Sequence, residues 1–150
     1  MYDRILVPLD GSAPSARGFD EALRLARAGR GTLVLLHVVD DLPMAAELAP
    51  ADAWEAMRRR AVTRGEALLA EAVSDASRAG VDATPVLREI TAERVADAIV
   101  DQARRSECDL IVMGTHGRHG LERLAMGSDA ELVLRHAPVP VMMVRRPPPH

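Results

Sequence analysis

Short apolar runs alternate with segments of helical periodicity along the whole of this 150-residue chain. Apolar runs bounded by turn residues predict buried strands, whereas apolar residues three and four apart predict helices. The predicted strands are Arg4–Leu9, Thr32–Val39, Val81–Arg88, Asp109–Met113 and Val139–Val144, and the predicted helices are Ser15–Ala28, Ala51–Ala79, Ala92–Arg105 and Ala130–His136. This alternation is typical of a parallel sheet with helices on both faces. We therefore predict a Rossmann-like, three-layer α/β/α fold around a five-stranded parallel sheet.

Two prolines predict the order of the strands. Pro85 lies in the middle of the third predicted strand, and Pro140 lies near the start of the fifth. Because proline has no N–H, it is confined to edge strands, strand starts and bulges. If the third and fifth strands are the edges, right-handed crossovers favour the order 3-2-1-4-5. The topological switch then lies between the first and fourth strands, where open α/β sheets bind ligands.

Turn residues predict the ends of the helices and of the domain. Gly29 and Gly31 are expected to close the first helix, Gly80 the second, and Thr91 is expected to cap the third. We expect one domain over residues 1–146, followed by an extended proline-rich tail over residues 147–150.

Glycines follow the fourth predicted strand at fixed spacing. Gly114 and Gly117 are separated by two residues, and nine further residues lead to Gly127 and Ser128, which open the last helix. Glycine lets backbone N–H groups approach an anion closely, and a helix N-terminus adds free N–H groups and a positive dipole end. The alternative is that these residues only form turns and a cap. The position at the switch favours a phosphate cradle.

Other polar and apolar residues fall near the same place. Asp10 ends the first strand, where a carboxylate can accept hydrogen bonds from ribose hydroxyls; the alternative is a helix cap or an Asx-turn. Val38 can form an apolar wall for adenine, although a strand valine is usually core. Arg118 is a better phosphate partner than His116 and His119, which are more typical of a solvated loop.

Composition excludes several function classes. All 19 basic residues are arginine, so neither a Walker A loop nor Schiff-base chemistry is available. The net charge of -3 argues against a nucleic-acid partner. The histidines show no metal-binding spacing and no serine lies in a nucleophile elbow, so we expect no metal ligands and no catalytic residue.

Cysteine content and hydropathy predict the compartment. The single cysteine, Cys108, cannot form an internal disulfide and is expected to be a small buried hydrophobe. No apolar run approaches the roughly 18 residues of a membrane-spanning helix, and the N-terminus lacks a signal-peptide pattern. We expect a soluble, cytoplasmic protein without a membrane partner.

Several stretches together resemble the universal stress protein family along nearly the whole chain. The stretches that carry the resemblance are residues 4–12, 35–39, 109–117, 127–128 and 137–141. The resemblance implies a Rossmann-like domain that forms a homodimer and, in the ATP-binding branch of the family, binds ATP.

The resemblance also implies roles for individual residues. Those assigned to adenine are Pro8, Leu9, Val38 and the backbone near Met113. Those assigned to ribose are Asp10 and Gly114. Those assigned to the phosphates are Gly117, Arg118, Gly127, Ser128 and the backbone of Asp129.

Asp129 departs from the family pattern, in which valine commonly follows the glycine-serine pair. Aspartate suits a helix N-terminus that has no ligand, but it repels a triphosphate unless Mg²⁺ lies between them. We therefore expect ATP to bind together with Mg²⁺.

Three functions remain open at this point. The first is an ATP-binding regulatory protein in the stress response, with little or no turnover. The second is a slow ATPase or nucleotidyl-transfer enzyme, and the third is a dimeric partner protein that binds no nucleotide. In each case we expect a homodimer through the apolar edge strand Val139–Val144.

Overall fold

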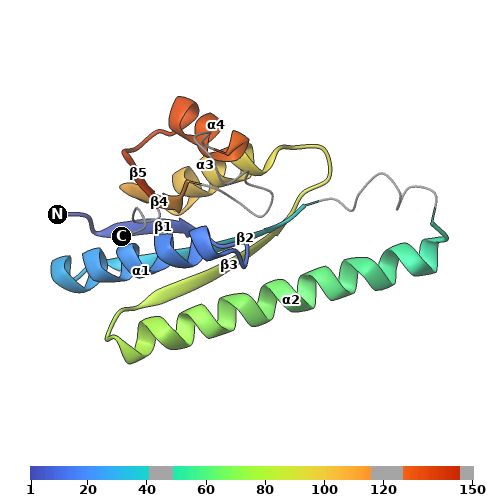
Figure 1. Ribbon diagram of the computed structural model, residues 1–150, viewed down its shortest axis with the longest axis horizontal. Helices are drawn as coiled ribbons and strands as arrows, with labels where there is room; N and C mark the ends of the chain where they lie inside the picture. The colour runs from blue at the N-terminus through green and yellow to red at the C-terminus, as the bar shows by residue number, and fades with distance from the viewer. Residues whose placement is uncertain (41–48, 116–126, 146–150) are drawn as a thin grey trace, which may run out of the picture.

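The computed structural model describes residues 1–40, 49–115 and 127–145, and strands and helices alternate through them (Figure 1). The elements are β1 (Arg4–Pro8), α1 (Ala13–Gly29), β2 (Thr32–Val39), α2 (Ala51–Arg78), β3 (Ala83–Glu89), α3 (Val95–Arg105), β4 (Leu110–Gly114), α4 (Ser128–His136) and β5 (Val141–Val144).

The strands of the described residues form one five-stranded sheet in the order β3-β2-β1-β4-β5, with every neighbouring pair parallel. The predicted α/β fold and strand order are therefore confirmed. Pro85 lies in β3, an edge strand, where its missing N–H costs least. Pro140 lies just before β5 rather than within it, and its carbonyl still accepts a hydrogen bond from Ile111 N–H at 3.0 Å.

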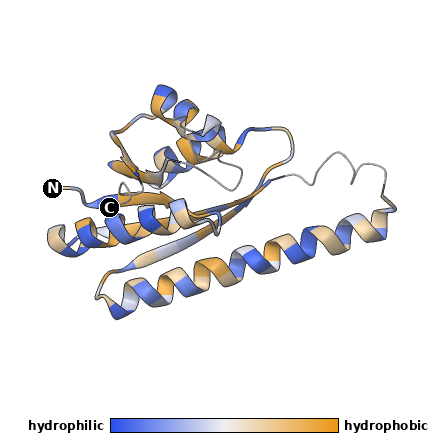
Figure 2. Cartoon of the chain, in the orientation of Figure 1, coloured by the Kyte–Doolittle hydropathy of each residue, from blue (hydrophilic) through white to orange (hydrophobic). Residues whose placement is uncertain are grey.

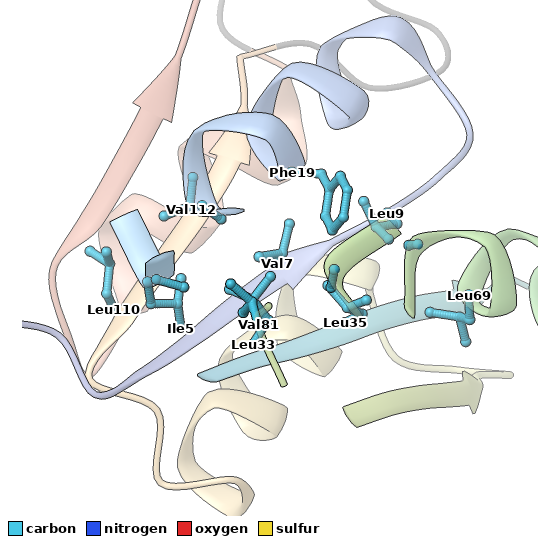
Figure 3. Packing of buried hydrophobic residues seen from close by; sticks show 14 residues of the cluster. Ile5, Val7, Leu9, Phe19, Leu33, Leu35, Leu69, Val81, Leu110 and Val112 are labelled. Atoms are coloured by element: carbon cyan, nitrogen blue, oxygen red, sulfur yellow. The ribbon is translucent and has the colours of Figure 1, made fainter. Parts of the chain in front are cut away.

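The two faces of the sheet carry separate hydrophobic cores. Ile5, Val7 and Leu35 face α1 and α2, together with Phe19 and Leu69 from those helices (Figure 3). Alternate strand residues face α3 and α4; Leu6, Leu36 and Ile111 of this second core pack against residues of both helices. Hydrophobic residues accordingly concentrate in the strands, while hydrophilic residues recur along the helices (Figure 2).

Helix α2 covers the sheet only with its C-terminal half. Its buried residues are Gly65, Leu69, Ala72 and Ala76, and the helix extends past the sheet on its N-terminal side (Figure 1). No helix in the described parts of the chain is both long and apolar enough to cross a membrane.

Several helix ends differ from the prediction. The left-handed residue that closes α1 is Arg30, with φ 58°, and not a glycine. Helix α3 begins at Val95 after Arg94, which gives no side-chain cap, so the cap predicted at Thr91 is wrong. Helix α1 begins earlier than predicted, because Ser12 caps it by accepting a hydrogen bond from Ser15 N–H at 3.2 Å.

Candidate functional site at the carboxyl edge of the sheet

The predicted topological switch lies between β1 and β4, which pair in parallel. The helix that follows β1 covers one face of the sheet, and the helix that follows β4 covers the other. In open α/β sheets, connections that diverge in this way favour ligand binding at the carboxyl ends of the two strands. The turn Asp10-Gly11-Ser12 lies at this edge.

Asp10 forms an Asx-turn at the end of β1. Its Oδ1 atom accepts a hydrogen bond from Ser12 N–H at 2.9 Å, and no other described residue donates to its Oδ2 atom. Gly11 follows with φ +83°, and a Cβ built there would meet nothing within 4 Å. The local interpretation of Asp10 as a turn residue is thus confirmed. The ribose role stays a prediction, for which the second carboxylate oxygen is available.

Packing between α1 and β4 requires a glycine at position 114, which the sequence alone did not show. It is buried at the end of β4, and a Cβ there would lie 2.3 Å from the carbonyl oxygen of Pro14 in α1. A Cβ on Gly18 would in turn lie 3.1 Å from Gly114 N. Helix α1 therefore packs directly against the end of β4, and this close approach requires glycine whether or not a ligand binds.

Helix α4 starts beside the end of β4. Gly127 N–H donates to the carbonyl oxygen of Thr115 at 2.9 Å, and the helix continues from Ser128 with Glu131 N–H bonded to Gly127 O at 3.0 Å. Asp129 lies in the first turn of α4, and Ala96 at the start of α3 is close enough to act on the pKa of its carboxyl group.

The surroundings of Asp129 disfavour its ionised form. Asp129 is exposed at the surface, but partial desolvation by its neighbours is the main cause that raises the pKa of its carboxyl group above the ordinary value. The negative charges of Asp40 and Asp10 raise the pKa of Asp129 further, and the backbone N–H of Ala96 opposes the shift.

Comparisons with known proteins agree with this architecture. The model of the universal stress protein family matches residues 1–145. The chain belongs to the universal stress protein family. A relative from Methanocaldococcus jannaschii, itself a universal stress protein, is 33% identical over 147 residues, which cover 98% of this chain and 84% of the relative.

Solved structures of the family are also similar to the chain. A member from Burkholderia pseudomallei is 33% identical, with a TM-score of 0.76 and coverage of 95% of this chain and 96% of that one. A universal stress protein solved in complex with cAMP is 26% identical, with a TM-score of 0.68 and coverage of 96% and 97%.

The residues that family resemblance assigns to adenine do not share one face of the sheet. Val38 and Met113 belong to the core on the α3 and α4 side, and Pro8, two residues after Leu6, alternates to that same side. Leu9 belongs to the opposite core, and its backbone N–H bonds Leu36 O of β2 at 2.7 Å.

Sequence reasoning missed Asp40, which acts on Asp129 through space. The sequence could have indicated Asp40, because it follows β2 just as Asp10 follows β1, and both strands end at the same edge of a parallel sheet. His37, in β2, has its Nδ1 atom 2.7 Å from Leu9 O, so its ring has a backbone partner.

Part of the predicted phosphate site lies outside the described residues. Gly117 and Arg118, with His116 and His119, fall in the range 116–126. Within the described ranges, no group of three or more histidine, cysteine, aspartate or glutamate side chains is arranged to hold a metal ion.

Proposed function

We propose that this protein binds an adenine nucleotide at the switch point between β1 and β4 and acts in the stress response as a ligand-binding regulatory protein with little or no turnover. The observation that carries the proposal is the placement of two elements at one edge of the sheet: Asp10 follows β1, and α4 begins beside the end of the neighbouring β4, where Gly127 N–H donates to Thr115 O at 2.9 Å. The proposal is also supported by the family member solved with cAMP, another adenine nucleotide.

The described residues fit the adenosine part of such a ligand. Asp10 presents a carboxylate oxygen that no described donor occupies, beside the open space at Gly11. A carboxylate at this place in an α/β sheet suits the hydroxyls of ribose. Val38 is half-buried on β2 and Met113 is 7% exposed on β4, on the same face, so they would supply apolar surface and backbone groups to the base.

The phosphate part of the ligand would lie toward α4. Gly127 and Ser128 begin that helix, followed by the backbone of Asp129. Gly117 is assigned to phosphate by its spacing and Arg118 by its charge. The backbone N–H groups at the start of a helix are natural donors to one phosphate.

Calorimetry with AMP, cAMP, ATP with Mg²⁺, and GTP tests the proposal. We expect binding of adenine nucleotides and a clear preference over GTP. Mass spectrometry of nucleotide released from the purified protein is an independent check. Neither heat nor a thermal shift with any adenine nucleotide at millimolar concentration would refute the proposed function.

A pair of glycine variants tests the assigned spacing. Gly117→Val should abolish nucleotide binding in a folded protein, because a side chain would enter the phosphate path. Gly120→Val is the matched control, since Gly120 lies in the same run but outside the spacing. Equal affinities of the two variants would contradict the role of Gly117.

A further inference from the structure

A cleft of about 220 Å³ lies between α1 and α2, on the face of the sheet opposite Val38 and Met113. Four residues of α1 and its cap form one wall, and they are spaced so that their side chains lie on one side of the helix. These residues are Ser12, Ser15, Ala16 and Phe19.

Helix α2 forms the facing wall with the same spacing. Its four lining residues are Leu68, Glu71, Ala72 and Asp75. The alanines at positions 16 and 72, one in each wall, leave space that larger side chains would fill. The cleft is therefore built from two matched helix faces.

The interior of the α1–α2 cleft is apolar. Leu9, at the end of β1, is 5% exposed and Phe19 is 7% exposed, and the two side chains lie next to each other (Figure 3). Leu68 is half-buried beside them in the same core. An apolar cavity of roughly 150 Å³ holds one benzene molecule, so this larger cleft has room for a six-membered ring with a short side chain.

The charged residues that line the cleft are both acidic. Asp75 forms an ion pair with Arg78, one turn further along α2, whose side chain is 72% exposed. Glu71 is exposed at the mouth of the cleft, and among the described residues none donates a hydrogen bond or forms an ion pair with it. Its carboxylate is therefore available to a positively charged ligand.

The serines of the other wall have their hydrogen bonds within the chain. The hydroxyl group of Ser15 donates to Ser12 O at 3.0 Å, and the backbone N–H of Ser15 donates to Ser12 Oγ at 3.2 Å. An anion in the cleft would face two carboxylates without these donors. An ammonium group brings three donors of its own and needs only acceptors.

We propose that the α1–α2 cleft binds a small primary amine of the arylalkylamine class. The ring would pack against Phe19, Leu9 and Leu68, and the ammonium group would meet the carboxylate of Glu71. This site is separate from the proposed nucleotide site, because Val38 and Met113 belong to the core on the other face of the sheet. The inference therefore does not depend on nucleotide binding.

A nuclear magnetic resonance titration of the isotope-labelled protein tests the proposal, with phenethylamine as the probe. Its amine is protonated near neutral pH, as an alkyl amine. We expect saturable shifts of the amide signals of residues 9–19 and 68–75 at millimolar ligand. Phenethyl alcohol, which keeps the ring and loses the charge, should bind about fivefold more weakly, the scale of an exposed ion pair. Hydrocinnamate, with a carboxylate in place of the amine, should not bind.

Two variants test the position of the ligand. Ala16→Leu should abolish phenethylamine binding, because leucine would fill the cleft, and the fold should tolerate it, since Ala16 is exposed and leucine is a good helix former. Glu71→Gln should weaken binding by about fivefold through loss of the ion pair.

Each variant has a matched control outside the cleft. Ala28→Leu makes the same change at an exposed position of α1, and Glu66→Gln makes the same charge change on α2. Both controls should bind phenethylamine as the unmodified protein does. The proposal would be overturned by the absence of saturable binding, by equal affinities within either pair of variants, or by phenethyl alcohol binding as tightly as phenethylamine.

Discussion

Cys108 shows how burial sets the chemistry of one side chain. It is 5% exposed between α3 and β4, and desolvation raises the pKa of its thiol from 9.0 to about 11. The nearby Arg4 opposes this shift and Asp109 adds to it. Because the thiolate is the reactive form, the folded protein should keep this single thiol inert at physiological pH.

Thiol reactivity provides the first prediction. At pH 8 the native protein should react with a disulfide reagent about 100-fold more slowly than denatured protein, from the two-unit pKa difference alone. Above about pH 9 the unfolded thiol ionises while the folded thiol does not, so the free energy of unfolding should fall as the pH rises towards 11. Absorbance assays with and without guanidinium measure the rates. Rapid, complete labelling of the native protein at pH 8 would contradict the prediction.

Gly114 provides the second prediction. The Cβ of alanine at this position would collide with the Pro14 carbonyl, a backbone group that cannot rotate away. Gly114→Ala should therefore lower the free energy of unfolding by about 3 kcal/mol, the upper range of overpacking costs. Urea denaturation measures the loss.

Gly80→Ala is the control for Gly114→Ala. Gly80 has φ +76° but open space around its Cβ position, so alanine there should cost only about 1 kcal/mol of backbone strain. A loss at Gly114 no larger than that at Gly80 would show that α1 can move away from β4.

At the scale of elements, the sequence predicted what depends on local pattern. The bounds of β2 were correct, and Pro85 identified an edge strand because a missing N–H restricts a strand wherever it lies. Contacts between distant elements left no local pattern. Thr91 suited a helix start, yet α3 begins four residues later at Val95, after Arg94, which gives no side-chain cap.

In the candidate site, too, features that depend on local pattern could be predicted, whereas contacts between distant elements could not. The switch point between β1 and β4 could be predicted, because strand order determines it, and the ligand site there remains a prediction. The sequence could not show that Gly114 is required by α1, or that Leu9 and Val38 face opposite cores. Both facts depend on which helix packs on which face.

Arg88 provides a prediction about how an edge strand is held. It extends from β3 to α3, where its guanidinium donates to Asp101 Oδ2 at 2.8 Å and to Ala98 O at 3.2 Å. The hydrogen bond from Arg88 is the main cause that lowers the pKa of Asp101, and Arg105 lowers this pKa further. Arg88→Met should lower the free energy of unfolding at pH 7 by about 1–2 kcal/mol, the scale of charged hydrogen bonds that are partly exposed.

The effect of Arg88→Met on stability should depend on pH. The lowered pKa of Asp101 means that its ionised carboxylate stabilises the fold at neutral pH, and this stabilisation disappears as acid protonates the group. The loss of stability caused by Arg88→Met should therefore be smaller at low pH. Arg105→Met is the control, since Arg105 contacts the same carboxylate at 2.6 Å but its side chain is 68% exposed, against 18% for Arg88. Chemical denaturation at several pH values measures both variants, and equal losses would contradict the anchoring role of Arg88.

At the scale of the whole molecule, the sheet ends in an apolar edge. β5 pairs with β4 on one side, and no described strand pairs with its other side. Its residues Val141, Met142, Met143 and Val144 are all half-buried, and Met142 and Val144 pack towards α1 and α2 while Val141 and Met143 pack towards α3 and α4. An open edge of this composition favours pairing with another strand.

The register of β5 identifies the backbone groups available to a second strand. The carbonyl groups of Pro140 and Val144 accept hydrogen bonds from Ile111 N–H and Thr115 N–H, so both point towards β4. Backbone groups alternate along a strand, and Met142 therefore also points towards β4. Val141 and Met143 point their N–H and carbonyl groups away from the sheet, where a second copy of the chain could meet them.

Homodimerisation through β5 is the final prediction, because two edges related by a two-fold axis would cover each other. Light scattering at tens of micromolar should give twice the protomer mass of 16.2 kDa. Met143→Pro should yield a folded monomer, since it removes an outward N–H and leaves the bonds to β4 intact. Met142→Pro, which removes an inward donor, should instead destabilise the fold. A monomeric unmodified protein would defeat the prediction, and so would a stable Met143→Pro dimer, because that interface could not depend on strand pairing at the β5 edge.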